Sequence, residues 1–116
     1  MKLGNEYLVQ VKPKDYERAK SFIENFLSDE ILVSNKEYFV VKLEGGERFG
    51  ISSEENAPTE KEYEFGTWLS LETDNFSKVI LKLKEAGLRE VKGGDSVAFF
   101  FNMPGGCVFK LKNTKR

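Results

Sequence analysis

The sequence contains no histidine and a single cysteine, Cys107. Histidine is the commonest general acid or base near neutral pH and a common ligand of transition metals, so its absence excludes histidine-based triads and metal sites. A single cysteine cannot form a disulfide within the chain. Any catalysis or metal binding would therefore depend on other side chains.

Long hydrophobic runs and a large net charge are also missing. The chain has 116 residues and a formal net charge of −1. No apolar run approaches the roughly 20 residues of a membrane-spanning helix, and the N-terminal "MKLGNEYLVQV" has no hydrophobic signal-peptide region. We expect one cytoplasmic domain without a membrane partner, and the weak charge argues against a nucleic-acid partner.

The sequence repeats itself. Gly45-Gly46 and Gly105-Gly106 lie 60 positions apart, and the same shift superimposes two probable helix starts, Asp15 and Asn75. The shift also aligns apolar positions: Val9 and Val11 with Leu69 and Leu71, Ile31 with Val91, residues 39–41 with 99–101, Phe49 with Phe109, and Ile51 with Leu111.

Each half has the pattern of a strand, a helix and three further strands. Alternating apolar residues predict the first strands near 7–11 and 69–73, and an amphipathic helix follows each. The later strands are expected at 30–34, 37–43 and 47–52, and at 88–92, 95–102 and 107–112, with the Gly-Gly pairs turning the last hairpins. The prediction is an α+β protein of two tandem βαβββ modules, about 1–52 and 65–116, joined by a linker at about 53–64.

This repeat resembles the vicinal oxygen chelate superfamily, which includes glyoxalase I, extradiol dioxygenases, fosfomycin-resistance enzymes and bleomycin-resistance proteins. The most specific segment is "MPGGCVFKL" at 103–111, where many members read Asp-Pro-Asp-Gly-Asn-x-x-Glu-Leu. The segments "FIENFL" and "LETDNFSKVILKLKEAGL" are similar to the helices of that family. The resemblance implies curved mixed sheets around a cavity within a single domain, and a homodimer.

In members of the family that use a metal, four strand positions provide the ligands, and the repeat places these positions at Leu8, Gly50, Trp68 and Lys110. Leucine and glycine have no donor, an indole N–H cannot coordinate, and a protonated lysine repels a cation. We therefore expect neither a metal nor another cofactor.

The cavity that the resemblance implies would be lined by the strand face opposite the helices. Its apolar wall with a few polar groups is typical of a small-molecule site, and Trp68 could stack on an aromatic or cationic ligand. Equally, Trp68 could only fill space, and Lys110 could only pair with Glu72. The predicted ligand-binding residues are Leu8, Gln10, Arg48, Gly50, Trp68, Ser70, Glu72, Val108 and Lys110, together with Phe100 and Asn102.

Three functions remain open at this point. The first is metal-independent binding of a small molecule, similar to the bleomycin-resistance branch, with no catalytic residue. The second is a lyase, transferase or dioxygenase-like enzyme of the same superfamily that would use Glu72, Lys110 or Tyr7 for proton transfer. The third is RNA binding through the aromatic segment 97–104, which the missing motif glycines and the charge disfavour.

Overall fold

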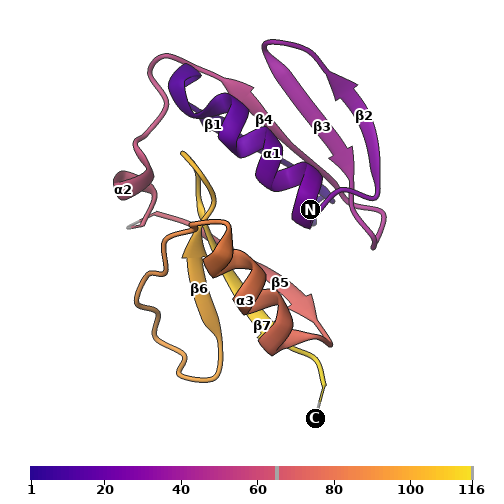
Figure 1. Cartoon of the computed structure of the whole chain (residues 1–116). Coiled ribbons are helices and arrows are strands. Elements are labelled where there is room, and N and C mark those ends of the chain that lie inside the picture. The colour runs from indigo at the N-terminus through magenta and orange to yellow at the C-terminus, as the bar shows by residue number, and fades with distance from the viewer. Residues whose placement is uncertain (65, 116) are drawn as a thin grey trace. The chain divides into compact units, whose positions relative to one another are not determined.

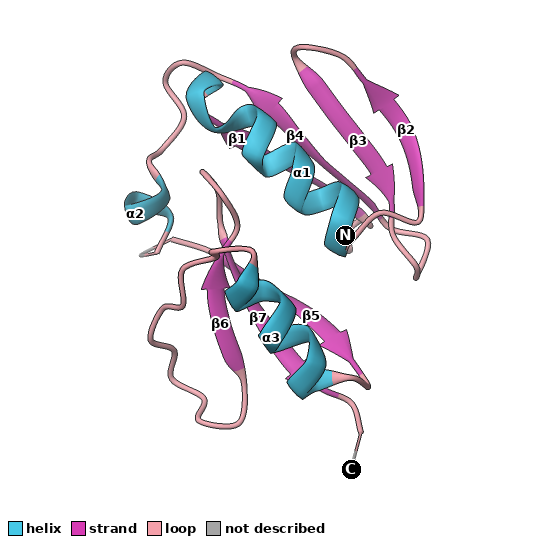
Figure 2. Cartoon of the chain, in the orientation of Figure 1, coloured by secondary structure: helices cyan, strands magenta, loops and turns pink. Residues whose placement is uncertain are grey.

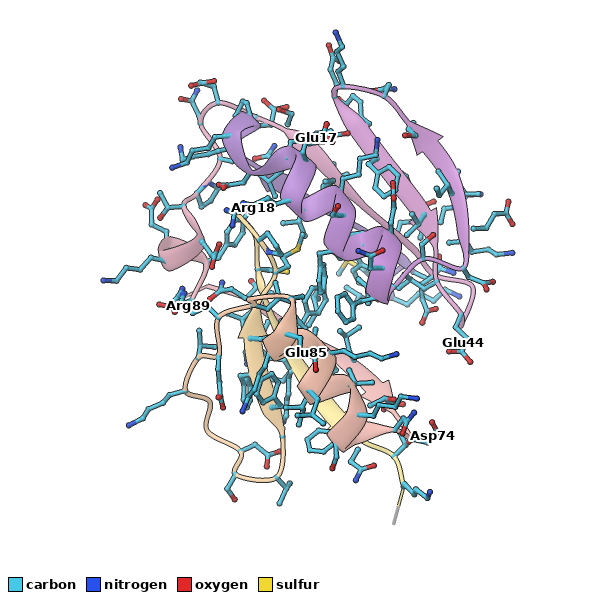
Figure 3. All side chains as sticks on the ribbon, viewed as in Figure 1. Glu17, Arg18, Glu44, Asp74, Glu85 and Arg89 are labelled. Carbon is cyan, nitrogen blue, oxygen red and sulfur yellow. The ribbon has the colours of Figure 1, made fainter. Side chains whose placement is uncertain are left out.

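The computed structural model describes residues 1–64 and 66–115, which form two compact units, Met1–Thr59 and a second unit that begins at Glu60 (Figure 1). The boundary falls inside the predicted linker. Within the described ranges, no helix is both long enough and apolar enough to cross a membrane. Charged side chains such as Glu17, Glu44, Asp74 and Glu85 are exposed (Figure 3).

The first unit contains the predicted βαβββ module. Its four-stranded sheet has the order β1-β4-β3-β2, in which β1 is parallel to β4 and the other neighbours are antiparallel. The elements are β1 (Glu6–Val11), the 3-10 turn η1 (Pro13–Asp15), α1 (Tyr16–Phe26), β2 (Glu30–Ser34), β3 (Tyr38–Lys42) and β4 (Arg48–Ser53).

One face of this sheet forms the core of the first unit beneath α1 (Figure 2). Val9 and Val11 of β1 are buried, as their alternation predicts, and they share the core with Ala19 and Ile23 of the helix. Asp15 precedes α1 as expected, but its carboxylate pairs with Arg18 at 2.6 Å and does not cap the helix. Among the described residues of the first unit, no helix packs on the opposite face of this sheet.

The second unit repeats this arrangement with a smaller sheet. Its strand order is β5-β7-β6, with β5 parallel and β6 antiparallel to the central β7. The elements are α2 (Glu60–Tyr63), β5 (Trp68–Thr73), α3 (Phe76–Glu85), β6 (Phe99–Asn102) and β7 (Val108–Asn113). The core includes Leu83 of α3 and the aromatic residues Phe99, Phe101 and Phe109.

The prediction of a strand at 88–92 was wrong. Only an isolated bridge joins Glu90 to Phe101, with the Val91 N–H donating to the Phe100 carbonyl at 3.0 Å. The segment is mostly polar, and Gly93-Gly94 follows it. It therefore has few side chains that could stabilise continuous pairing with β6. Residues 95–98 also lie outside β6, because the carboxylate of Asp95 accepts the Val97 N–H and forms a turn. A short helix, α2, lies where a linker without structure was expected.

The two Gly-Gly turns are present but differ in detail. In each, the second glycine N–H donates to the carbonyl three residues earlier, at 2.9 Å for Gly46 and 3.1 Å for Gly106. The glycine with positive φ is Gly46 in the first turn but Gly105 in the second, at 91° and 69°. The repeat therefore preserves the hairpin but not its backbone conformation.

Candidate functional site

The sheet of the second unit brings the predicted residues of that half onto one face. Trp68 lies opposite Val108, while Lys110 lies between Ser70 and Phe100 on the neighbouring strands. Residues that directly oppose each other in a ladder project to the same face. The remaining predicted residues, Glu72 and Asn102, share this face by alternation, and α3 covers the other.

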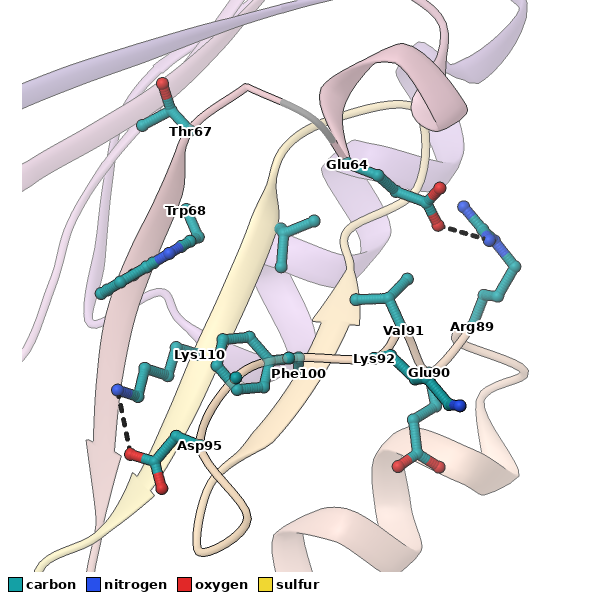
Figure 4. A pocket seen from close by; sticks show the side chains of 13 residues that line it. Glu64, Thr67, Trp68, Arg89, Glu90, Val91, Lys92, Asp95, Phe100 and Lys110 are labelled. Carbon is teal, nitrogen blue, oxygen red and sulfur yellow. Dashed lines mark ion pairs between the residues drawn. The ribbon is translucent and has the colours of Figure 1, made fainter.

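A cavity of about 710 Å³ opens over part of this face (Figure 4). The chain between α3 and β6 forms one side of it, and β5, β6 and β7 form the other. Among the predicted residues, Ser70, Glu72 and Asn102 do not line it. The lining residues are Glu64, Thr67, Trp68, Arg89–Asp95, Phe100, Val108 and Lys110.

Two aromatic rings and a lysine form the centre of the site. The rings of Trp68 and Phe100 meet edge to face, with centroids 6.4 Å apart and an interplanar angle of 86°. The ammonium of Lys110 lies 5.1 Å from the Trp68 centroid and 5.8 Å from the Phe100 centroid, within the range of cation–π attraction. Trp68 is nevertheless 52% exposed, so part of its ring is available to a ligand.

The partner of Lys110 is Asp95, not the predicted Glu72. The Lys110 Nζ lies 3.1 Å from Oδ2 of Asp95 (Figure 4), whereas Glu72 is exposed and opposite Lys112. Glu72 lies two residues further along β5 than Ser70, the strand neighbour of Lys110. The loop before β6 instead brings a carboxylate directly to the ammonium.

The surroundings of Asp95 favour its ionised form. The backbone N–H of Val97 donates to its Oδ1 at 3.0 Å, and Lys110 contacts its other oxygen. These contacts, with a further contribution from the charge of Lys112, lower the pKa of Asp95 below its ordinary value. Asp95 is therefore a carboxylate at neutral pH.

Gly93 allows the loop to lie directly against Phe100. A Cβ atom at Gly93 would overlap the Phe100 ring, whereas one at Gly94 would meet nothing within 4 Å. The absence of a side chain at Gly93 therefore brings the loop onto the ring, and Phe100 is only 7% exposed. This packing fixes the wall of the cavity that carries Asp95.

A second polar network includes two further lining residues of the cavity, Glu64 and Arg89. Arg89 pairs with Glu64 at 2.6 Å and donates to Oδ1 of Asn102 at 3.0 Å. The amide nitrogen of Asn102, which is 1% exposed, donates to the carbonyls of Gly106 at 3.0 Å and Glu60 at 3.2 Å. Asn102 thus holds the β6–β7 turn, which does not match its predicted role as a ligand contact.

The four predicted residues of the first unit share the open face of its own sheet. Leu8 lies opposite Gly50, and Gln10 and Arg48 alternate with them. A Cβ atom at Gly50 would lie 2.8 Å from Cγ2 of Val40, so neighbouring side chains already fill that position. The lining of the cavity includes none of the four.

The donor chemistry of the four strand positions does not fit a divalent metal. Leu8, Gly50, Trp68 and Lys110 offer no carboxylate, imidazole or thiolate. In the part of the chain that the structure describes, no cluster of three or more potential ligand side chains could hold an ion. Cys107 is buried, and burial raises the pKa of its thiol to about 12, so it is not a reactive nucleophile.

Sequence reasoning missed Glu64, Arg89, Gly93 and Asp95. Periodicity identifies the faces of strands, but Glu64 directly follows α2 and the other three residues lie on the irregular segment between α3 and β6. The one available signal was the run "GGDS" at 93–96, which predicts a turn but not what the turn contacts.

No protein-family model and no curated protein sequence matches this chain. Solved structures do match its fold. A possible glyoxalase from Bacillus cereus has a TM-score of 0.73 at 16% identity, over 96% of this chain and 99% of that one. The fosfomycin resistance protein FosX from Listeria monocytogenes, complexed with Mn(II) and sulfate, has a TM-score of 0.77 at 13% identity, over 97% of this chain and 90% of that one. FosX from Mesorhizobium loti has a TM-score of 0.74 at 14% identity, over 99% of this chain and 94% of that one. The chain therefore has the fold of the vicinal oxygen chelate superfamily, as the resemblance in its sequence predicts.

Proposed function

We propose that this protein binds a small organic molecule without a metal, in the cavity of the second unit and against Trp68. The observation that carries the proposal is a half-exposed indole at the wall of a cavity of about 710 Å³. That volume is typical of small-molecule sites, in which an apolar wall and a few polar groups orient the ligand. Tryptophan is highly buried on average, so an indole that is half exposed at a cavity wall favours contact with a ligand.

The side chains at the site favour binding over proton transfer. Of the three residues considered for catalysis, Lys110 is engaged with Asp95, and Glu72 does not line the cavity. Tyr7 lies opposite Phe49 in the first unit, on the core side of that sheet. A general acid or base must reach the reacting group of the ligand. Glu72 and Tyr7 do not line the cavity, and the ammonium of Lys110, which does line it, is held in an ion pair with Asp95.

The ligand we propose is aromatic. The Lys110 ammonium already occupies the position over both rings where a cationic ligand would gain most, so a cation would meet a like charge there. The glyoxalase and fosfomycin resistance proteins share only the fold, so a sequestering role in resistance is part of this proposal.

The test is a fluorescence titration of Trp68, the sole tryptophan, in the presence of EDTA. The panel holds a bleomycin-type glycopeptide, other aromatic antibiotics and glutathione conjugates, with divalent metals tested separately. We expect saturable quenching by an aromatic compound that mass spectrometry then recovers unchanged. A chemically altered compound, or a response to metals alone, would overturn the proposal.

Calorimetry on two variants provides the matched control. Trp68→Ala should weaken binding by about five- to 150-fold, because stacking on an aromatic side chain contributes on the order of 1–3 kcal/mol. Leu81→Ala removes a hydrophobic side chain that is 61% exposed in the same unit but outside the cavity, and binding should be unchanged. Equal losses in both variants would show that binding does not depend on this site.

A further inference from the structure

The geometry points to a ligand that carries an acidic group, which replaces Asp95 on Lys110 while the aromatic part of the ligand lies on Trp68. This inference rests on the proposed function and names its ligand class. In this proposal, Lys110 forms an anion site that the Asp95 carboxylate occupies in the free protein. Binding of the ligand then displaces Asp95 from Lys110.

The first argument concerns Lys110. Its ammonium lies at a mostly buried position, with a side-chain exposure of 16%, and it lines the cavity. The rings of Trp68 and Phe100 attract its charge but accept no conventional hydrogen bond, while an ammonium has three donors. The ammonium is therefore suited to an anion that enters from the cavity.

The second argument concerns Asp95, which is held loosely enough to leave. Its side chain is 36% exposed, and ion pairs of this kind contribute little net stability. Its Oδ1 accepts the Val97 N–H of its own turn, so it keeps that hydrogen bond when it releases Lys110. Replacement by a ligand carboxylate exchanges one ion pair for another, and the exposed carboxylate returns to water.

The third argument concerns the other two cations that line the cavity, Arg89 and Lys92. Arg89 is already neutralised by Glu64 at 2.6 Å and Glu60 at 3.5 Å, and both carboxylates are more buried than Arg89 itself. Lys92 is exposed, so an anion gains less from it than from the mostly buried Lys110. Lys110 is thus the cation beside the two rings whose partner a ligand anion can exchange.

The fourth argument concerns distance. The exposed indole and the ammonium are 5.1 Å apart, measured to the ring centroid, so one small aromatic acid can contact both. A ring on Trp68 supplies apolar contact, and the acidic substituent supplies a charge-assisted hydrogen bond. Together these contacts specify an aromatic carboxylate or a similar aromatic anion.

The experiment compares three probes of nearly equal shape by calorimetry in EDTA: 2-naphthoate, 2-naphthamide and 2-naphthylmethylammonium. The wild-type protein should bind the naphthoate about tenfold tighter than the amide, and the cation most weakly. Asp95→Asn keeps an acceptor for the Val97 N–H but removes the competing charge. It should tighten naphthoate binding by up to about fivefold and leave the amide unchanged.

Two substitutions at Lys110 complete the design. Lys110→Met keeps an extended side chain against the rings and should abolish the preference for naphthoate over naphthamide. Lys110→Arg restores the charge and should restore the preference, which a purely structural role of Lys110 would not produce.

Equal or stronger binding of the amide or the cation would overturn this inference and leave the proposed function intact. So would failure of all three probes when a neutral or cationic compound of the fluorescence panel binds. If Trp68 responds to no compound at all, the proposed function fails as well.

Discussion

At the scale of single residues, the proposed ligand chemistry rests on Lys110 and Asp95. Lys110 stands where the resemblance in the sequence would place a metal-binding acid, and Asp95 reaches it from the loop before β6. Lys110 places an ammonium beside two aromatic rings, and Asp95 balances its charge. The fold alone does not specify a ligand, so the proposal depends on these two side chains.

Acid should break the contact between Asp95 and Lys110. The Val97 N–H, Lys110 and Lys112 lower the pKa of Asp95, so the stability from its ionised form is present above the ordinary value of 3.8 and is lost as pH falls through the lowered value. An NMR titration of the Val97 amide should therefore show a midpoint below 3.8. The Asp95→Asn variant should show no such transition, and a wild-type midpoint above the ordinary value would contradict the geometry.

Gly93 and Gly94 form a matched pair. Gly93→Ala places a methyl group into the Phe100 ring, and we expect it to lower the free energy of unfolding by about 1–3 kcal/mol. Gly94→Ala adds a methyl group that meets nothing within 4 Å, so it should change the free energy of unfolding by less than about 0.5 kcal/mol. Chemical denaturation of both variants measures the difference, and equal stabilities would show that the loop does not pack on Phe100.

At the scale of elements, the aromatic contacts between β6 and β7 hold the second unit together. Phe101 is 1% exposed, and its ring centroid lies 5.7 Å from that of Phe109 and 6.0 Å from that of Phe99. These rings lie on the face beneath α3, opposite the cavity. They support the site from behind without contacting a ligand.

Phe101→Ala should destabilise the protein by about 3–5 kcal/mol, the usual range for deletion of a buried aromatic ring. Leu81→Ala, at a side chain that is 61% exposed on α3, should change stability by less than about 0.5 kcal/mol. Thermal and denaturant unfolding would measure both. A loss below about 1 kcal/mol in Phe101→Ala would show that this sheet face is not a packed core.

The sequence predicted those elements whose side chains alternate against a core. Alternating buried residues mark the core face of each strand, as Val9 and Val11 do in β1 and Phe109 and Leu111 do in β7. These strands and the orientation of their side chains could therefore be predicted from periodicity. The segment at 88–92 misled the prediction because the shift of 60 aligned Val91 with a strand residue, while its polar neighbours could not sustain a ladder. The ion pair between Asp95 and Lys110 is a contact between a loop and a strand, which no local pattern encodes.

At the scale of the whole molecule, the chain consists of two related units, each with its own helix-covered sheet. The open face of the first sheet exposes Leu8, Val33 and Tyr38 at 55%, 41% and 44%. An apolar surface of this kind on a sheet is commonly covered in an assembly. The homodimer therefore stays a prediction of this account.

Sedimentation equilibrium should give about twice the chain mass of 13.3 kDa at micromolar concentration. Leu8→Lys should weaken the association, because a charge would be buried at the interface. Lys78→Glu, an exposed substitution on the helix of the second unit, should leave the mass unchanged. A monomer at all concentrations would contradict the dimer.

The most direct test of the central claim is an NMR titration that follows the indole N–H of Trp68. As the sole tryptophan, Trp68 gives a single indole resonance in the ¹⁵N-labelled protein. With EDTA present, the account predicts that an aromatic ligand shifts this resonance saturably. In a separate titration without EDTA, Mg²⁺ or Zn²⁺ alone should leave it unchanged. An indole resonance that stays fixed with every organic compound, or that moves only with a divalent cation, would contradict metal-independent binding at this site.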